Sequence, residues 1–81
     1  MTEQSVEPAQ ILDATGLNCP MPLLKAKKAL NEMAASEVLK VLATDPGSER
    51  DFETFSKQSG HALLESRKDG DTYIYVLRKK L

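Results

Sequence analysis

The segment that decides the fold runs from residue 10 to residue 33 and reads QILDATGLNCPMPLLKAKKALNEM. Its first residues, Gln10 to Ala14, predict a short strand, and Thr15 to Asn18 predict a turn in which Gly16 takes a positive φ. A helix is expected from Pro20 to Met33, because proline is tolerated in the first helical turn and the following apolar residues recur at helical spacing. The segment therefore predicts a strand, a turn and an amphipathic helix that covers a sheet.

Further elements are expected beyond this segment. In chain order they are a strand at 37–44, a helix at 48–59 and two strands at 61–68 and 72–79. The pair Asp69-Gly70 predicts a two-residue hairpin turn between the last two strands. The βαβαββ order predicts an α+β fold, a two-layer α/β sandwich in which two helices cover one face of a four-stranded mixed sheet.

The second helix has typical boundary residues at both ends. The segment 45–47 breaks the preceding strand, Ser48 is the expected cap, and Asp51 follows it at a box-like spacing. Gly60 is well placed to end the helix. Capping of this helix is the expected role of Asp45 and Asp51, and a functional role is the alternative.

Length and composition indicate a single globular domain. The chain has 81 residues, of which 41% are apolar and 28% charged, and its formal net charge is −1. These values argue against disorder and give no electrostatic case for binding duplex nucleic acid or an anionic membrane. We expect residues 1–8 to form a flexible tail and residues 9–81 to form the domain. The polar N-terminus predicts no signal peptide and no apolar run can span a bilayer, so the cytoplasm is the expected location.

One cysteine, Cys19, and one histidine, His61, limit the possible chemistry. A single thiol excludes an intrachain disulfide and any two-cysteine redox motif. These two residues are too few soft ligands for a structural zinc site, so we expect no metal. Covalent chemistry must therefore pass through Cys19. We expect His61 to be partly exposed at a strand start and away from the thiol.

Cys19 precedes Pro20 at the expected start of the first helix, where unpaired amides and the helix dipole favour a negative charge. The sequence therefore predicts a partly exposed thiol whose pKa is lower than that of free cysteine. Pro20 and Pro22 stiffen the turn around it. The alternative is that Cys19 is a small buried apolar residue, as a lone cysteine often is.

Apolar and basic residues close to this thiol predict a docking surface. Met21 and Leu24 project from the polar side of the first helix, where an exposed apolar patch suggests contact with a partner. Lys25 and Lys28 share that side and suit an acidic partner surface, and Arg50 is a further candidate for partner contact. The alternatives are that the apolar pair packs under the N-terminal tail or a loop and that the basic residues are only solvated.

The run from Leu12 to Pro22 resembles the signature of the TusA family, the SirA-like sulfur carriers, whose motif is Cys-Pro-x-Pro a few residues after a glycine. Weaker matches follow at Asp45-Pro46, Arg50-Asp51 and Gly60-His61. The resemblance covers essentially the whole chain. It implies the same two-layer sandwich that the periodicity predicts independently.

The resemblance implies that Cys19 carries sulfur as a persulfide. The donor would be a cysteine desulfurase or a rhodanese-like protein, and the sulfur would pass to a downstream acceptor protein in tRNA 2-thiouridine formation, molybdenum cofactor synthesis or sulfur oxidation. Gly16, Pro20 and Pro22 would form the framework of the loop, and no bound cofactor is implied. A single thiol suits this role, because a second cysteine would attack the inner sulfur and release sulfide.

The sequence leaves two other classes of function open. A non-catalytic regulatory module would bind a protein partner through an exposed sheet face carrying Tyr73, Tyr75 and Leu77, which alternation along the last strand places together. Direct nucleic-acid binding is disfavoured by the near-neutral charge and the few aromatic residues.

Overall fold

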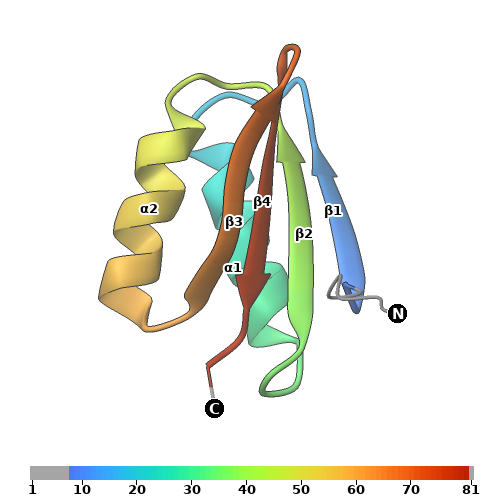
Figure 1. The fold of residues 1–81 in the computed structure, drawn as a ribbon, viewed down its shortest axis with the longest axis vertical. Helices are drawn as coiled ribbons and strands as arrows, with labels where there is room; N and C mark the ends of the chain where they lie inside the picture. The colour runs from blue at the N-terminus through green and yellow to red at the C-terminus, as the bar shows by residue number, and fades with distance from the viewer. Residues whose placement is uncertain (1–7, 81) are drawn as a thin grey trace.

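The computed structural model describes residues 8–80 (Figure 1). Its elements are β1 (Gln10–Ala14), α1 (Met21–Asn31), β2 (Val38–Ala43), α2 (Ser48–Ser59), β3 (Ala62–Asp69) and β4 (Thr72–Arg78). The predicted βαβαββ order is confirmed. The predicted tail, residues 1–8, lies outside the described residues except for Pro8.

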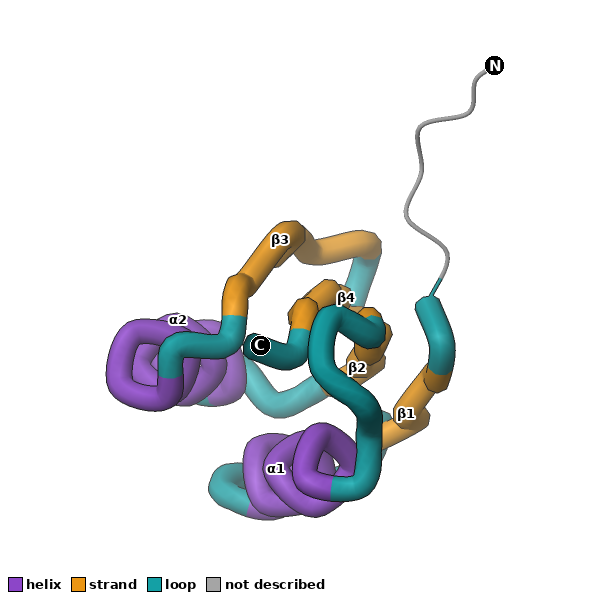
Figure 2. The backbone as a smooth tube through the Cα atoms, turned by 90° about the horizontal axis from the view of Figure 1, so that it is seen from below, coloured by secondary structure: helices purple, strands orange, loops and turns teal. Residues whose placement is uncertain are grey.

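The strands form one mixed sheet in the order β1-β2-β4-β3. β1 is parallel to β2, whereas β4 is antiparallel to both of its neighbours, β2 and β3. Figure 2, which looks along the strands, shows both helices on the same side of the sheet. The structure is therefore the two-layer α/β sandwich that the sequence predicts.

Helix α1 is shorter than predicted at both ends. Pro20 is its N-cap, with a φ of −99° and a ψ of 16°, and the helix begins at Met21. At the other end the amide of Met33 bonds the carbonyl of Leu30, three residues back, at 3.1 Å. This tightening of the last turn ends the α-helix at Asn31, while Met33 still packs in the core.

The core lies between the helices and the sheet. Leu30 of α1 and Phe52 of α2 are fully buried there. The ring of Phe52 stacks on that of Tyr75, with 4.4 Å between the centroids and 8° between the planes, so α2 is fixed to the centre of the sheet. The sheet contributes the buried residues Ala14, Leu39, Val41, Ala43, Tyr75 and Leu77.

The predicted exposed face of Tyr73, Tyr75 and Leu77 is wrong. These residues do share one side of β4, but this is the side that the helices cover. Tyr75 and Leu77 are fully buried, and Tyr73 is partly buried against the same core. The surface on which a regulatory module was predicted is therefore part of the core.

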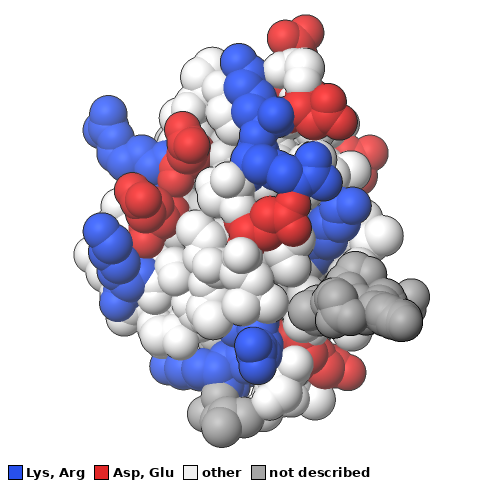
Figure 3. Space-filling model, in the orientation of Figure 1, with Lys and Arg blue, Asp and Glu red and all other residues white. Residues whose placement is uncertain are grey.

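The face of the sheet that the helices leave uncovered carries charges of both signs. Figure 3 shows them in the orientation of Figure 1, in which α1 lies behind the strands. Lys40 pairs with Val76 in the register, and Arg67 of β3 forms an ion pair with Glu65. The described part of this face therefore mixes apolar and charged side chains instead of presenting one apolar patch.

None of the helices within residues 8–80 is both long enough and apolar enough to cross a membrane.

Leu30→Ala should lower the free energy of unfolding by about 2–5 kcal/mol, because Leu30 is fully buried and its truncation leaves a cavity. Leu24→Ala is the matched control on the same helix, since 47% of the surface of Leu24 is accessible, and its effect should stay within about 0.5 kcal/mol. Urea denaturation followed by circular dichroism measures both changes. Equal losses in the two variants would contradict the assignment of the core face.

Candidate functional site

The carboxyl ends of β1 and β2 and the first turns of α1 and α2 lie at the same end of the molecule (Figure 1). Residues 15–20 connect β1 to α1, and residues 44–47 connect β2 to α2. The amide of Gly16 joins the two loops by donating to the hydroxyl of Thr44 at 2.8 Å. Gly16 has a φ of +82°, and a Cβ there would meet no atom within 4 Å. The backbone conformation rather than the available space therefore favours glycine.

Cys19 lies in the first of these loops, next to the N-cap of α1, and is exposed. Its peptide bond to Pro20 is cis. The amide of Met21 donates to the carbonyl of Asn18 at 2.8 Å and closes the turn around the cysteine, while buried Pro22 anchors the start of the helix. The predicted exposure of Cys19 is confirmed, and the alternative of a buried apolar cysteine is wrong.

The thiol of Cys19 donates a hydrogen bond to the carboxylate of Asp51, with 2.7 Å between Sγ and Oδ2. This hydrogen bond is the main cause that raises the pKa of the Cys19 thiol, followed by desolvation and by the negative charges of Asp51 and Asp45. The predicted lowering of this pKa is therefore wrong. The contact with Asp51 therefore favours the protonated form of the Cys19 thiol.

Two prolines explain why the start of α1 does not lower the pKa of the Cys19 thiol against the effect of these carboxylates. Pro20 and Pro22 have no amide hydrogen, and the amide of Met21 is already bonded to Asn18. The first turn of α1 therefore offers few free donors to a thiolate. The carboxylate of Asp51 is in direct contact with the sulfur and disfavours the negative charge.

A buried polar pair, Ser48 and Tyr75, anchors the first turn of α2 to the sheet. The hydroxyl of Ser48 donates to the carbonyl of Asp45 at 2.7 Å and lies 2.7 Å from the hydroxyl of Tyr75. Ser48 is therefore a buried anchor and not the predicted cap, since Gly47 occupies the N-cap position and no side chain caps this helix.

The predicted capping roles of Asp45 and Asp51 are also wrong. The side chain of Asp51 accepts the hydrogen bond of Cys19, and Asp45 bonds the helix start through its backbone carbonyl, which accepts from the amide of Ser48 at 3.0 Å. The Oδ2 atom of Asp45 is buried without a hydrogen-bond partner among the described residues. A Cβ at Gly47 would lie 3.1 Å from this oxygen, so glycine leaves room for the carboxylate.

The residues predicted to contact partners are exposed. The accessible fractions are 42% for Met21 and 47% for Leu24, so the described loops do not cover the apolar pair. We call the following set the docking rim: Met21, Leu24, Lys25, Lys28 and Arg50. A cavity of about 170 Å³ borders Lys25 and Lys28, between α1 and the edge strand β1. The predicted exposure of these residues is confirmed.

His61 follows α2 at the opposite end of the molecule and is not part of this site (Figure 1). It is buried rather than partly exposed, with Nδ1 accepting from the amide of Lys80 at 3.0 Å and the ring packed on Phe55. Burial, and then the charges of Lys80 and Lys79, lower the pKa of His61. His61 is therefore a neutral structural residue.

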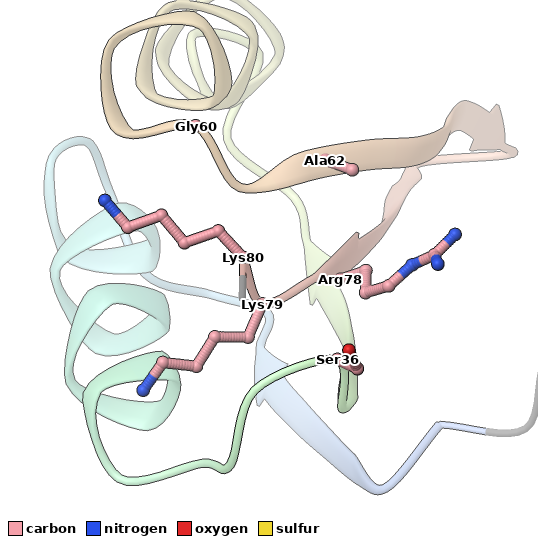
Figure 4. A pocket seen from close by; sticks show the side chains of 6 residues that line it. All are labelled: Ser36, Gly60, Ala62, Arg78, Lys79 and Lys80. Atoms are coloured by element: carbon pink, nitrogen blue, oxygen red, sulfur yellow. The ribbon is translucent and has the colours of Figure 1, made fainter.

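A cavity of about 240 Å³ lies at this same end of the molecule. Its lining residues are Ser36, Gly60, Ala62, Arg78, Lys79 and Lys80. Figure 4 shows the three basic side chains extending in different directions, and Nζ of Lys79 donates to the carbonyl of Met33 at 2.7 Å. The cavity therefore lacks the converging donors of an anion site.

The candidate site thus combines one exposed nucleophilic atom, Sγ of Cys19, with an adjacent acceptor, Asp51. No three side chains of His, Cys, Asp or Glu between residues 8 and 80 are grouped as metal ligands. The chemistry that this arrangement can perform is that of a thiol.

Residues 10–79 match the family model of the sulfurtransferase TusA. The chain belongs to the TusA family. It is 53% identical over 70 residues to the sulfur carrier protein TusA of Allochromatium vinosum, which covers 86% of this chain and 92% of that protein. It is 47% identical over 73 residues to the sulfur carrier protein TusA of Pseudomonas putida, covering 90% of this chain and 91% of the relative.

A solved structure agrees with this assignment. The crystal structure of a SirA-like protein from Desulfitobacterium hafniense has a TM-score of 0.77 and 28% sequence identity, and the match covers 89% of this chain and 99% of that one. Both the TusA-family resemblance and the fold predicted from the sequence are confirmed.

Asp51 is the residue of this TusA-family site whose contact the sequence reasoning missed. The available signal was topological. Parallel strands β1 and β2 bring their carboxyl ends to one edge of the sheet, so the first turns of the helices that follow them lie close together. A carboxylate in the first turn of α2 is thereby a candidate neighbour of Cys19.

His61 should make the stability of this TusA-family domain depend on pH. Its pKa is lower in the folded than in the unfolded chain, so the unfolded chain binds more protons and stability falls as the pH drops through the unfolded value of about 6.5. In His61→Asn the side-chain oxygen can accept from Lys80 without titrating, and the loss of stability from about pH 7.5 to about pH 5.5 should shrink. Urea midpoints at both pH values measure this. An undiminished pH dependence in the variant would contradict the assignment.

Proposed function

We propose that this TusA-family domain is a sulfur carrier that takes up sulfur as a persulfide on Cys19 and passes it to another protein. The donor is a cysteine desulfurase or a rhodanese-like protein, and the acceptor belongs to a pathway such as tRNA 2-thiouridine formation or molybdenum cofactor synthesis. The observation that carries the proposal is the exposed thiol of Cys19 in a loop of the TusA family.

Sulfur uptake is a thiol exchange. Sγ of Cys19 loses its proton and attacks the terminal sulfur of the donor persulfide. A new S–S bond forms on Cys19, the S–S bond of the donor breaks, and its electron pair leaves on the cysteine sulfur of the donor, which takes up a proton. Release reverses these roles, with Cys19 as the leaving thiolate. Because two different proteins must reach the same atom, the exposure of Cys19 supports this function.

The neighbourhood of Cys19 supports exchange with partners. Gly16, Pro20 and Pro22 serve as the framework that holds the loop, and the docking rim offers apolar surface next to basic charges. The chain contains one cysteine, so no second thiol of its own competes for the inner sulfur of the persulfide. An exposed thiol that must stay reduced suits the cytoplasm, which we propose as the location.

Incubation with a cysteine desulfurase, its cofactor and cysteine should increase the mass of the protein by one sulfur atom. Cys19→Ser should abolish this increase and keep its fold, because Cys19 is exposed. Intact-mass spectrometry measures the loading, and circular dichroism with a urea midpoint checks the fold of the variant. Absence of loading under conditions that load another carrier of the family would refute the proposal.

Leu24→Asp should slow loading by about 5- to 30-fold if Leu24 contributes about 1–2 kcal/mol to docking of the donor. Ile11→Asp is the matched control, since Ile11 is 60% exposed on β1 and outside the docking rim, and it should load at the rate of the unmodified protein. The rate at which iodoacetamide alkylates Cys19 should be unchanged in both variants, which separates docking from reactivity. Equal loading by the two variants would exclude Leu24 from the donor contact.

A further inference from the structure

The carboxylate of Asp51 contacts the sulfur on which the proposed function depends. The residues are 32 positions apart in the chain, yet Sγ and Oδ2 are 2.7 Å apart. Ordinary thiol exchange has no need of this contact, since a carboxylate beside a thiol disfavours the reactive thiolate. The placement of Asp51 therefore calls for a role of its own.

Both sides of the contact are held by the fold. On the side of Cys19, Gly16 bonds Thr44 and Met21 bonds Asn18, each at 2.8 Å. These two bonds hold the loop that carries the Cys19 thiol.

On the side of Asp51, the next residue, Phe52, is fully buried and stacks on Tyr75. Ser48, one turn earlier, is buried between Asp45 and the Tyr75 hydroxyl. The backbone of the first turn of α2 is therefore fixed relative to the sheet, and the carboxylate is held within reach of the sulfur.

The charges that act on the thiol come from α2 and from the loop that precedes it. Asp51 lies in the first turn of α2, and Asp45 lies between β2 and α2. Near the end of β1, just before the cysteine loop, the carboxylate of Asp13 instead accepts from the amide of Thr15 at 3.0 Å and from its hydroxyl at 2.6 Å. The thiol thus faces two carboxylates from one side, of which Asp51 is in contact.

We propose that Asp51 is a positioning residue that holds the empty carrier in an unreactive state, because its carboxylate accepts the thiol hydrogen of Cys19 and keeps the sulfur protonated until a docked donor displaces this hydrogen bond. The proposal deepens the sulfur-carrier function and rests on it. In this proposal Asp51 determines when the sulfur reacts and does not determine which partner binds.

This role has a chemical use. Oxidation, alkylation and thiol exchange all proceed through the thiolate, so a protonated sulfur is protected although it is exposed. A persulfide carries no hydrogen on Sγ, and the loaded carrier therefore lacks the donor of the bond to Asp51. The empty and loaded states consequently differ in whether the cysteine loop is tied to α2 by this bond.

The test is the pH profile of the second-order rate constant for alkylation of Cys19 by iodoacetamide, measured on the full chain without any donor. Asp51→Asn should move the midpoint of the profile to lower pH. Below the midpoint the rate should rise about threefold for each unit of that movement, since the tenfold gain in thiolate is partly offset by lower nucleophilicity.

Three controls make the result specific to this contact. Glu49→Gln removes an exposed carboxylate from the same turn of α2 and should keep the unmodified profile. Asp51→Glu retains the charge and should restore most of the original midpoint. Asp45→Asn removes the more distant charge and should give a smaller movement in the same direction as Asp51→Asn. Circular dichroism and urea midpoints establish that each variant is folded.

An Asp51→Asn profile with an unchanged or higher midpoint would overturn the proposal, as would an equal movement in Glu49→Gln. The carrier function is tested separately by persulfide loading. A moved profile without loading would refute the carrier function and with it the biological role of Asp51, whereas loading without a moved profile would refute the role of Asp51 alone.

Discussion

The stacking of Phe52 on Tyr75 is the contact on which the geometry of the site depends. With the ring centroids 4.4 Å apart, it attaches α2 to β4 and therefore to the middle of the sheet. The hydroxyl of Tyr75 also bonds that of Ser48, so one side chain anchors the first turn of α2 by an apolar and a polar contact. Asp51 lies between these two anchors in the sequence, and its position follows from theirs.

Two opposing effects act on the ionisation of Cys19: the start of a helix favours the thiolate, and the carboxylate of Asp51 disfavours it. A helix start usually favours a thiolate through its free amides, but here two prolines and a bonded Met21 amide leave that helix end with few donors. Asp51 contributes a full negative charge in hydrogen-bond contact. The direct contact is the stronger effect, so the sulfur is exposed to partners while its pKa is raised.

Much of the fold and part of the site could be predicted because the relevant signals are local. Gly16, the prolines of the loop and the apolar spacing of α1 each act within a few residues, and they predict the turn, the helix and its exposed side. The exposure of Cys19, Met21 and Leu24 was predicted for the same reason. The two prolines at the start of α1 are also a local signal against a lowered thiol pKa, since proline lacks the amide hydrogen that would stabilise a thiolate.

The sequence by itself determined the order of the elements, the family and the single reactive sulfur, because these depend on periodicity, turn residues and a short motif. Only the tertiary structure decided which side of β4 is covered, since alternation with a period of two is the same for a strand facing either way. It also decided the burial of His61 and the ionisation of Cys19. Both depend on neighbours distant in the chain, Lys80 for the histidine and Asp51 for the thiol, which come into contact only when the helices pack on the sheet.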